Sequence, residues 1–132
     1  MIQKFVYKKK IYAEIIRSKI KSNKTRFFSD SKSSFQFGFV AHEKGYTENP
    51  HYHKKILRKI KDCQQVLFIQ KGKVAIKFYN KKKQIIKKII VKKGDSINII
   101  QGFHSIKMLQ NSQCLTVKQG PFISEKMDKV DV

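Results

Sequence analysis

The sequence has few acidic residues and very few arginines. Nine Asp and Glu stand against 30 Lys and Arg, which gives a net charge of +21 at pH 7. Such an imbalance attracts polyanions by counterion release. Arginine, which binds guanine edges and phosphates in a bidentate manner, occurs only at Arg17, Arg26 and Arg58. We therefore favour an A+T-rich base composition as the source of the lysines and disfavour a nucleic-acid partner. Weak, salt-sensitive attraction to anionic sugars or nucleotides is the remaining alternative.

Long apolar runs and clustered cysteines are also missing. No apolar run approaches the roughly 20 residues that span a bilayer, so we expect no membrane span. Residues 1–10 mix lysines with aromatic residues and contain no apolar h-region, which predicts no signal peptide. Cys63 and Cys114 lie far apart and form no CxxC pair. A reduced, cytoplasmic setting is the simplest interpretation.

Glycine and proline are scarce, and no repeat or low-complexity linker divides the chain. A chain of 132 residues is long enough to bury a core as one domain, residues 1–132, without disulfides. Apolar positions mostly recur with period two, the pattern of strands separated by short polar turns. The predicted strands are 35–40, 66–69, 73–78, 85–91, 97–100, 105–109 and 114–118. This pattern predicts an all-β barrel or sandwich.

The ends of the chain are less regular. Residues 11–20 could form a strand or a short helix, and the adjacent Ile15 and Ile16 without a clear cap favour the strand. Residues 27–34 are polar and predict a loop or one helical turn, and residues 124–132 are expected to lie loosely on the surface.

The apolar faces of the strands predict the core: Val66, Phe68, Val74, Ile76, Phe78, Ile97 and Ile99.

Three of the four histidines are candidate ligands. His51 and His53 straddle Tyr52, and residues two apart in a strand point to the same face. A rigid pair of imidazoles supplies two metal donors at low entropic cost. His104 is the third candidate, whereas His42 follows an expected strand and is expected to be exposed.

Glycine and glutamine residues lie at characteristic distances around these histidines. Gly45 lies six positions before His51, Gln65 lies seven positions before Gly72, and His104 follows Gly94 by ten residues. This spacing resembles the cupin superfamily. The chain looks closest to small cupins encoded near surface-polysaccharide genes. The stretches that carry the resemblance are 15–17, 64–69, 72–74, 94–95, 102–104 and 117–122, which together cover nearly the whole chain. The resemblance implies a single cupin domain, a double-stranded β-helix or jelly-roll barrel.

The resemblance also implies a site. A divalent metal ion would be held by His51, His53, Gln65 and His104, and would act as a Lewis acid. Most metal cupins carry glutamate where this chain has Gln65, and an uncharged amide weakens metal affinity. Eleven residues separate His53 from Gln65, where the common motif has three or four, so we expect a lengthened hairpin. Gln64, one step along the strand, should face away from the pocket.

Three functions follow as alternatives. The first is a metal-capable cupin that binds a small polar molecule, a sugar or sugar nucleotide in surface-glycan biosynthesis. Arg58 would anchor a phosphate or carboxylate, and Tyr52 would stack on a sugar ring. Metal-free ligand binding by the three histidines is the competing interpretation of the pocket. Cupins of this size often dimerise, so a homodimer is also an expectation.

The second function is enzymatic. His51-Tyr52-His53-Lys54-Lys55 is similar to the HxHKK segment of cupin keto-isomerases that act on deoxysugar nucleotides without a metal. His51 and His53 would then serve as acid and base, because imidazole titrates near neutral pH. The third is a non-catalytic sensor or binding module, which the amide at Gln65 favours. The sequence leaves open whether the protein is an enzyme.

Overall fold

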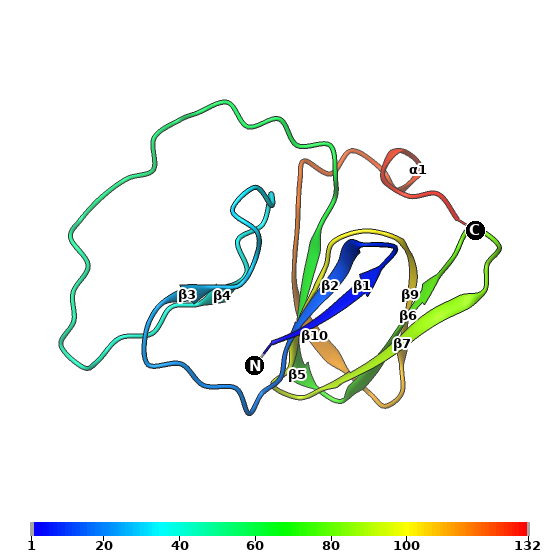
Figure 1. The fold of residues 1–132 in the computed structure, drawn as a ribbon, viewed down its shortest axis with the longest axis horizontal. Helices are drawn as coiled ribbons and strands as arrows, with labels where there is room; N and C mark the ends of the chain where they lie inside the picture. The colour runs from blue at the N-terminus through cyan, green and yellow to red at the C-terminus, as the bar shows by residue number, and fades with distance from the viewer. Residues whose placement is uncertain (1, 132) are drawn as a thin grey trace.

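The computed structural model describes residues 2–131 and confirms the all-β fold (Figure 1). Its strands form antiparallel sheets of five, three and two strands. The five-stranded sheet has the order β1 (Gln3–Tyr7), β2 (Lys10–Ile16), β8 (Ser96–Ile99), β5 (Gln65–Lys71) and β10 (Gln113–Lys118). The three-stranded sheet has the order β7 (Ile85–Lys92), β6 (Lys73–Tyr79) and β9 (Phe103–Met108). We call these two sheets together the two-sheet body.

The core lies between the two sheets of the body. Strand β6 contributes Val74, Ile76 and Phe78, each at most 1% exposed, because alternate side chains of a strand face the same side. The five-stranded sheet faces them with Ala13, Ile15, Leu67, Ile69, Ile97 and Ile99, and β7 adds Ile89 and Val91. Phe5 and Phe78 also pack ring to ring, with centroids 5.2 Å apart. The resulting arrangement of two packed antiparallel sheets fits a jelly roll.

One predicted core face was wrong. In the run 66–69 all four residues are apolar, so the period does not say which two face inward. The structure turns Leu67 and Ile69 into the core, whereas Val66 is half-buried and Phe68 is 38% exposed on the opposite face. The predicted core positions at Val74, Ile76, Phe78, Ile97 and Ile99 are confirmed.

The outer face of the five-stranded sheet carries a buried polar group. Glu14 and Asn98 are paired across β2 and β8, and the Asn98 Nδ2 donates to the Gln64 Oε1 at 3.1 Å. Residues from the segment before β4 cover these side chains, because Ser29 Oγ donates to Glu14 Oε1 and Gln64 Nε2 donates to Ser33 Oγ. All three side chains are at most 2% exposed. A polar face of the sheet is thus protected by loop residues instead of by apolar side chains.

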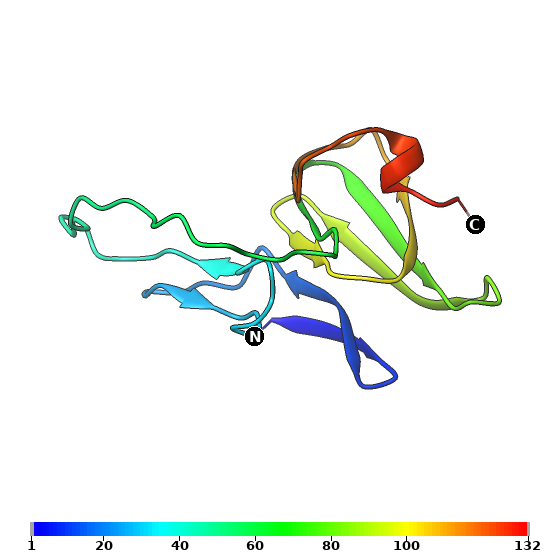
Figure 2. The ribbon, with the colours of Figure 1, turned by 90° about the horizontal axis from the view of Figure 1, so that it is seen from above.

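A long segment projects from the body. Strands β3 (Arg26–Phe27) and β4 (Gly38–Phe39) pair at its base, with two residues in each strand. Most of the strand predicted at 35–40 is therefore absent. Residues 40–63, which we call the arm, contain no strand or helix, and every residue from 42 to 63 is exposed. Figures 1 and 2 show the arm extending away from the body before it returns to β5. The lengthened hairpin predicted before Gln65 is therefore wrong, because no strand within residues 2–131 pairs with the arm.

The chain ends in a single helical turn, α1 (Glu125–Asp128), at one end of the body (Figure 1). Ser124 caps it, because its side chain accepts a hydrogen bond from the Met127 N–H. This turn is tied to β10, since Lys118 Nζ lies 3.0 Å from Asp128 Oδ2. Residues 124–131 lie on the surface, as expected, and this ion pair ties them to the body. Within residues 2–131, no helix has the length and apolar character needed to cross a membrane.

Candidate functional site

A cavity of about 610 Å³ opens at the end of the body that α1 covers. It brings together Gln65 and His104, two of the side chains that the sequence singled out. Ile99 and Ile106 give it an apolar wall, and Lys118 contributes a positive charge. The other lining residues are Cys63, Gly102, Phe103, Asp128, Lys129, Val130 and Asp131. We call this the α1 cavity.

Strand register fixes the positions of its polar side chains. Gln65 is the first residue of β5 and is paired with Lys118, the last residue of β10. The Gln65 Nε2 donates to Thr116 Oγ1 at 3.0 Å, which leaves the amide oxygen free to accept. His104 lies on β9 of the opposite sheet and is paired with Phe78. Both sheets therefore contribute hydrogen-bonding groups to the same cavity.

The tautomer of His104 follows from its backbone contact. Its Nδ1 lies 2.9 Å from the carbonyl oxygen of Gly102, and a carbonyl only accepts, so Nδ1 carries the proton. Nε2 is then the acceptor in the neutral ring. An acceptor at His104 and an amide oxygen at Gln65 can receive hydrogen bonds from hydroxyl groups of a ligand.

The charged groups of the cavity influence one another. The hydrogen bond from Lys118 to Asp128 raises the pKa of the lysine, so Lys118 stays cationic over the whole physiological range. Partial burial raises the pKa of the Cys63 thiol, and the nearby carboxylate of Asp128 raises it further. Cys63 is therefore a neutral thiol at pH 7. A thiol in that state is a poor nucleophile and a poor metal ligand.

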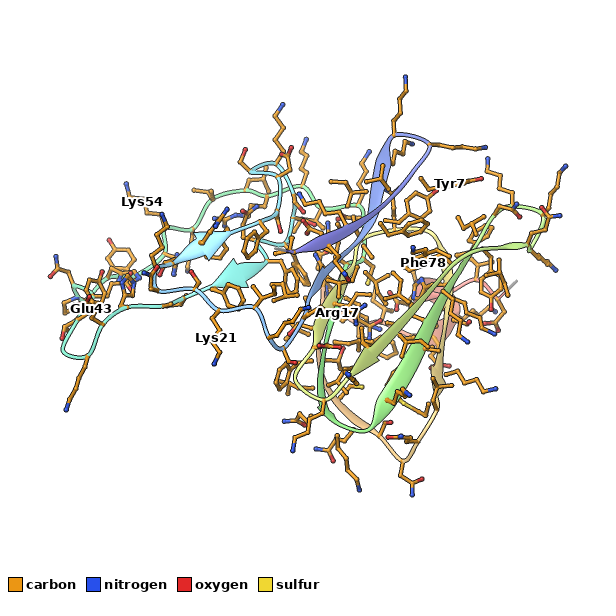
Figure 3. All side chains as sticks on the ribbon, turned by 60° about the horizontal axis from the view of Figure 1, so that its bottom comes forward. Tyr7, Arg17, Lys21, Glu43, Lys54 and Phe78 are labelled. Atoms are coloured by element: carbon orange, nitrogen blue, oxygen red, sulfur yellow. The ribbon has the colours of Figure 1, made fainter. Side chains whose placement is uncertain are left out.

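The structure does not bring His51 and His53 to His104. Both lie on the arm, and neither belongs to a strand, so the strand geometry expected for this pair is wrong. Their rings meet edge to face with centroids 5.4 Å apart, and His51 is held by Glu48 and by the carbonyl of Asn49. In Figure 3 the neighbouring Lys54 lies far from Phe78, the residue against which His104 packs at 6.1 Å.

These positions do not fit a metal held by the predicted ligands. A metal requires several donors within about 2 Å of one point. Among residues 2–131, no group of three or more His, Cys, Asp or Glu side chains is placed to hold an ion. The metal site at His51, His53, Gln65 and His104 stays a prediction that would require the arm to fold back over the α1 cavity.

The other predicted binding residues also lie on the arm. Tyr52 is 86% exposed and Arg58 is exposed, so neither contributes to the α1 cavity. His42 is exposed, as expected, and stacks on Tyr46 with ring centroids 3.8 Å apart. Gln64 faces away from the cavity, as expected. On that other face of the sheet, its side chain belongs to the buried polar group that contains Asn98.

Comparison with known proteins does not assign the chain to a family. No family model, no curated protein and no solved structure matches the chain. Its function has to be argued from its own residues.

Three residues of the α1 cavity were missed in the sequence. Lys118 was one of many lysines, and only the pairing of β10 with β5 places it beside Gln65. Asp128 lies in a charged C-terminal stretch that gave no strand signal. Cys63 lies where the arm meets the body, and no motif marks it. The one usable signal was position, since Lys118 ends the predicted strand 114–118 and Gln65 directly precedes the predicted strand 66–69.

Proposed function

We propose that this protein is a small-molecule-binding jelly-roll module of the cupin type, whose ligand occupies the α1 cavity. One observation carries the proposal: Gln65, His104 and Lys118, from three different strands and both sheets, line the same cavity. A mostly apolar cavity with a few convergent polar groups is the usual form of a ligand site, and the volume lies within the common range.

The chemistry of the cavity favours a sugar or a sugar nucleotide as the ligand class. The Gln65 oxygen and the His104 Nε2 can accept hydrogen bonds from sugar hydroxyls. Lys118 directs one ammonium N–H at Asp128 Oδ2, and its other two N–H groups can bind a phosphate. A role in surface-glycan biosynthesis rests on the resemblance of the sequence to cupins found near such genes.

The structure supports binding more than turnover. Acid–base catalysis by His51 and His53 would require a substrate held beside them, and both histidines lie on an exposed arm. Within the α1 cavity, the lysine is paired with Asp128 and the cysteine is a neutral thiol. The binding-module alternative is therefore the form of the proposal that we adopt.

Calorimetric titration with UDP-glucose, glucose 1-phosphate and glucose tests the proposal. We expect the two phosphorylated probes to bind more tightly than glucose, because Lys118 can pair only with them. His104→Ala and Gln65→Ala should each weaken binding about tenfold, the effect of one lost hydrogen bond. Lys118→Met should remove the preference for the phosphorylated probes.

Matched substitutions outside the cavity serve as controls. His42→Ala on the arm, Gln70→Ala at the far end of β5 and Lys87→Met on β7 change the same side-chain types and should leave affinity unchanged. Equal weakening by His42→Ala and His104→Ala would contradict the proposal. So would an absence of binding of all three probes at millimolar concentration.

A further inference from the structure

A second cavity, of about 660 Å³, lies between two hairpins of the body. One wall is the β1–β2 hairpin and the other is the β6–β7 hairpin, and the cavity meets the α1 cavity at Gly102 and Phe103. Lysines and aromatic residues dominate its lining, which we call the hairpin cleft. Its lining residues are Tyr7, Lys8, Lys10, Tyr12, Tyr79, Asn80, Lys81, Lys82, Gln84, Gly102 and Phe103.

The hairpin cleft is positively charged without compensation. Four lysines line it, and no carboxylate is among its lining residues in the part of the chain that the structure describes. The sequence explains this, because no acidic residue precedes Glu14 and none lies between Asp62 and Asp95. The charge of the cleft is therefore available to a ligand.

Lys8, which lines the cleft, and its neighbour Lys9 adopt a backbone conformation that other residues adopt more easily. Lys8 and Lys9 form the two-residue turn of the β1–β2 hairpin, with φ of 48° and 63°. Asn-Gly is the preferred pair in such a turn, because side chains disfavour the left-handed region. An A+T-rich base composition does not explain the choice, since asparagine codons are as A/T-rich as lysine codons. Strained positions of this kind often mark function.

Aromatic rings lie directly beside these lysines. Tyr7 and Tyr12 meet edge to face at 5.7 Å, and Lys8 Nζ lies 5.5 Å from the centre of the Tyr7 ring. The Tyr79 hydroxyl bonds to Ser105 Oγ at 2.8 Å, which fixes that ring at the cleft. Phe103 is 43% exposed and offers the most accessible ring. In Figure 3, Tyr7 lies on the body, well separated from Lys54 and Glu43 on the arm.

Together these features match what single-stranded nucleic acids require. Lysines attract the phosphate backbone, and aromatic rings stack on bases of any sequence. We propose that the hairpin cleft binds single-stranded nucleic acid, with phosphates at Lys8, Lys10, Lys81 and Lys82 and a base on Phe103. The sequence argued against a nucleic-acid partner because arginine is scarce and an A+T-rich base composition accounts for the lysines. Folding gathers four of them around aromatic rings.

Fluorescence anisotropy with a labelled oligouridine of about twelve nucleotides tests this proposal. If four phosphates are neutralised, the affinity should fall roughly 50-fold between 50 and 200 mM salt, from a slope of about −0.7 for each phosphate. Changing all four cleft lysines to glutamine should abolish most of this salt dependence. Phe103→Leu should weaken binding at least fivefold at constant salt, because leucine cannot stack.

A variant with the same change in net charge separates the cleft from general electrostatics. Lys44, Lys54, Lys55 and Lys59 all lie on the exposed arm, and their change to glutamine should leave affinity within twofold. Equal losses in the cleft and arm variants would overturn the proposal. It would also be overturned if Phe103→Leu had no effect, if inorganic polyphosphate competed as well as the oligonucleotide, or if UTP bound as tightly.

Two further measurements keep these outcomes interpretable. Thermal unfolding of each variant shows whether it is folded, and a variant that unfolds is replaced by the double variant Lys81→Gln, Lys82→Gln at the other hairpin. That double variant should halve the salt slope. Because the lysine variants of the cleft leave every residue of the α1 cavity in place, sugar-nucleotide binding in that cavity can fail or succeed independently.

Discussion

The two-sheet body and the arm contain similar residue types but use them differently. In the body, isoleucine and valine alternate with polar residues, and one set is buried between the sheets. In the arm, Ile56, Leu57 and Ile60 are 60%, 87% and 48% exposed. The arm has no strand partner, so its apolar side chains have nothing to pack against. Hydrophobic content alone therefore does not bury a segment, because strand pairing and the alternation of apolar with polar residues are both needed.

The same difference separates the two sets of candidate site residues. Gln65, His104 and Lys118 lie on strands, so neighbouring strands hold their side chains in place. His51, His53, Tyr52 and Arg58 lie on the arm, where only local contacts such as the bond from His51 to Asn49 hold them. A preorganised site is built most readily on rigid elements. This is why the α1 cavity carries the proposed function.

The largest expected effect contrasts a core residue with an arm residue. Phe78→Ala should lower the free energy of unfolding by about 3–5 kcal/mol, because it leaves a cavity in the body. Leu57→Ala should change it by less than about 0.5 kcal/mol. Chemical denaturation of both variants measures the difference. Similar losses in the two variants would show that the arm packs against the body or against a second copy.

A pair of glycines sharpens the comparison next. Gly72, between β5 and β6, has a φ of 90°, and a Cβ there would collide with Ser112 and the backbone of Asn111. Gly72→Ala should therefore cost about 2–3 kcal/mol. Gly45, on the arm, has a φ of 92° but nothing within 4 Å of an added Cβ, so Gly45→Ala should cost only about 1 kcal/mol of backbone strain. An equal cost in thermal unfolding would contradict the view that the arm is unpacked.

Substitutions in the hairpin turn at Lys8 and Lys9 should raise the stability of the protein instead of lowering it. Changing Lys8→Asn together with Lys9→Gly supplies the residues that this turn prefers and removes two like charges. We expect stability to rise by about 1 kcal/mol, while oligouridine binding weakens, since Lys8 lines the hairpin cleft. Denaturation and anisotropy measure the two effects on one sample. A gain in stability with unchanged binding would remove Lys8 from the proposed site.

The smallest effect lies where the arm meets the body. Because the pKa of Cys63 is raised, its alkylation by iodoacetamide should be slow at pH 8. The alkylation rate should rise only at a pH higher than the pH at which the rate of an ordinary thiol rises. Asp128→Asn removes a carboxylate that raises this pKa, so the rate at pH 8 should increase severalfold. Cys114 gives the internal control, since burial alone raises its pKa and its rate should not change. An unchanged Cys63 rate would show that α1 does not lie over the α1 cavity in solution.

Much of the fold was predictable because hydrophobic alternation is a local signal. The strand around Val74, Ile76 and Phe78 was identified by period two. The same logic failed at 66–69, where both faces are apolar, and at 35–40, where alternation was present but only Gly38 and Phe39 pair with another strand. Alternation indicates a strand, but long-range pairing decides whether it forms and which face is buried.

The site was less predictable because it depends on register between distant strands. The sequence alone determined the all-β class, the strong positive charge and most of the core, because each follows from composition or from local alternation. Only the tertiary structure decided that Lys118 lies beside Gln65, that His51 and His53 lie far from His104, and that two lysine-rich hairpins enclose aromatic rings. The physical reason is that side chains distant in sequence meet only through strand pairing and sheet packing, and neither is encoded within a single stretch of residues.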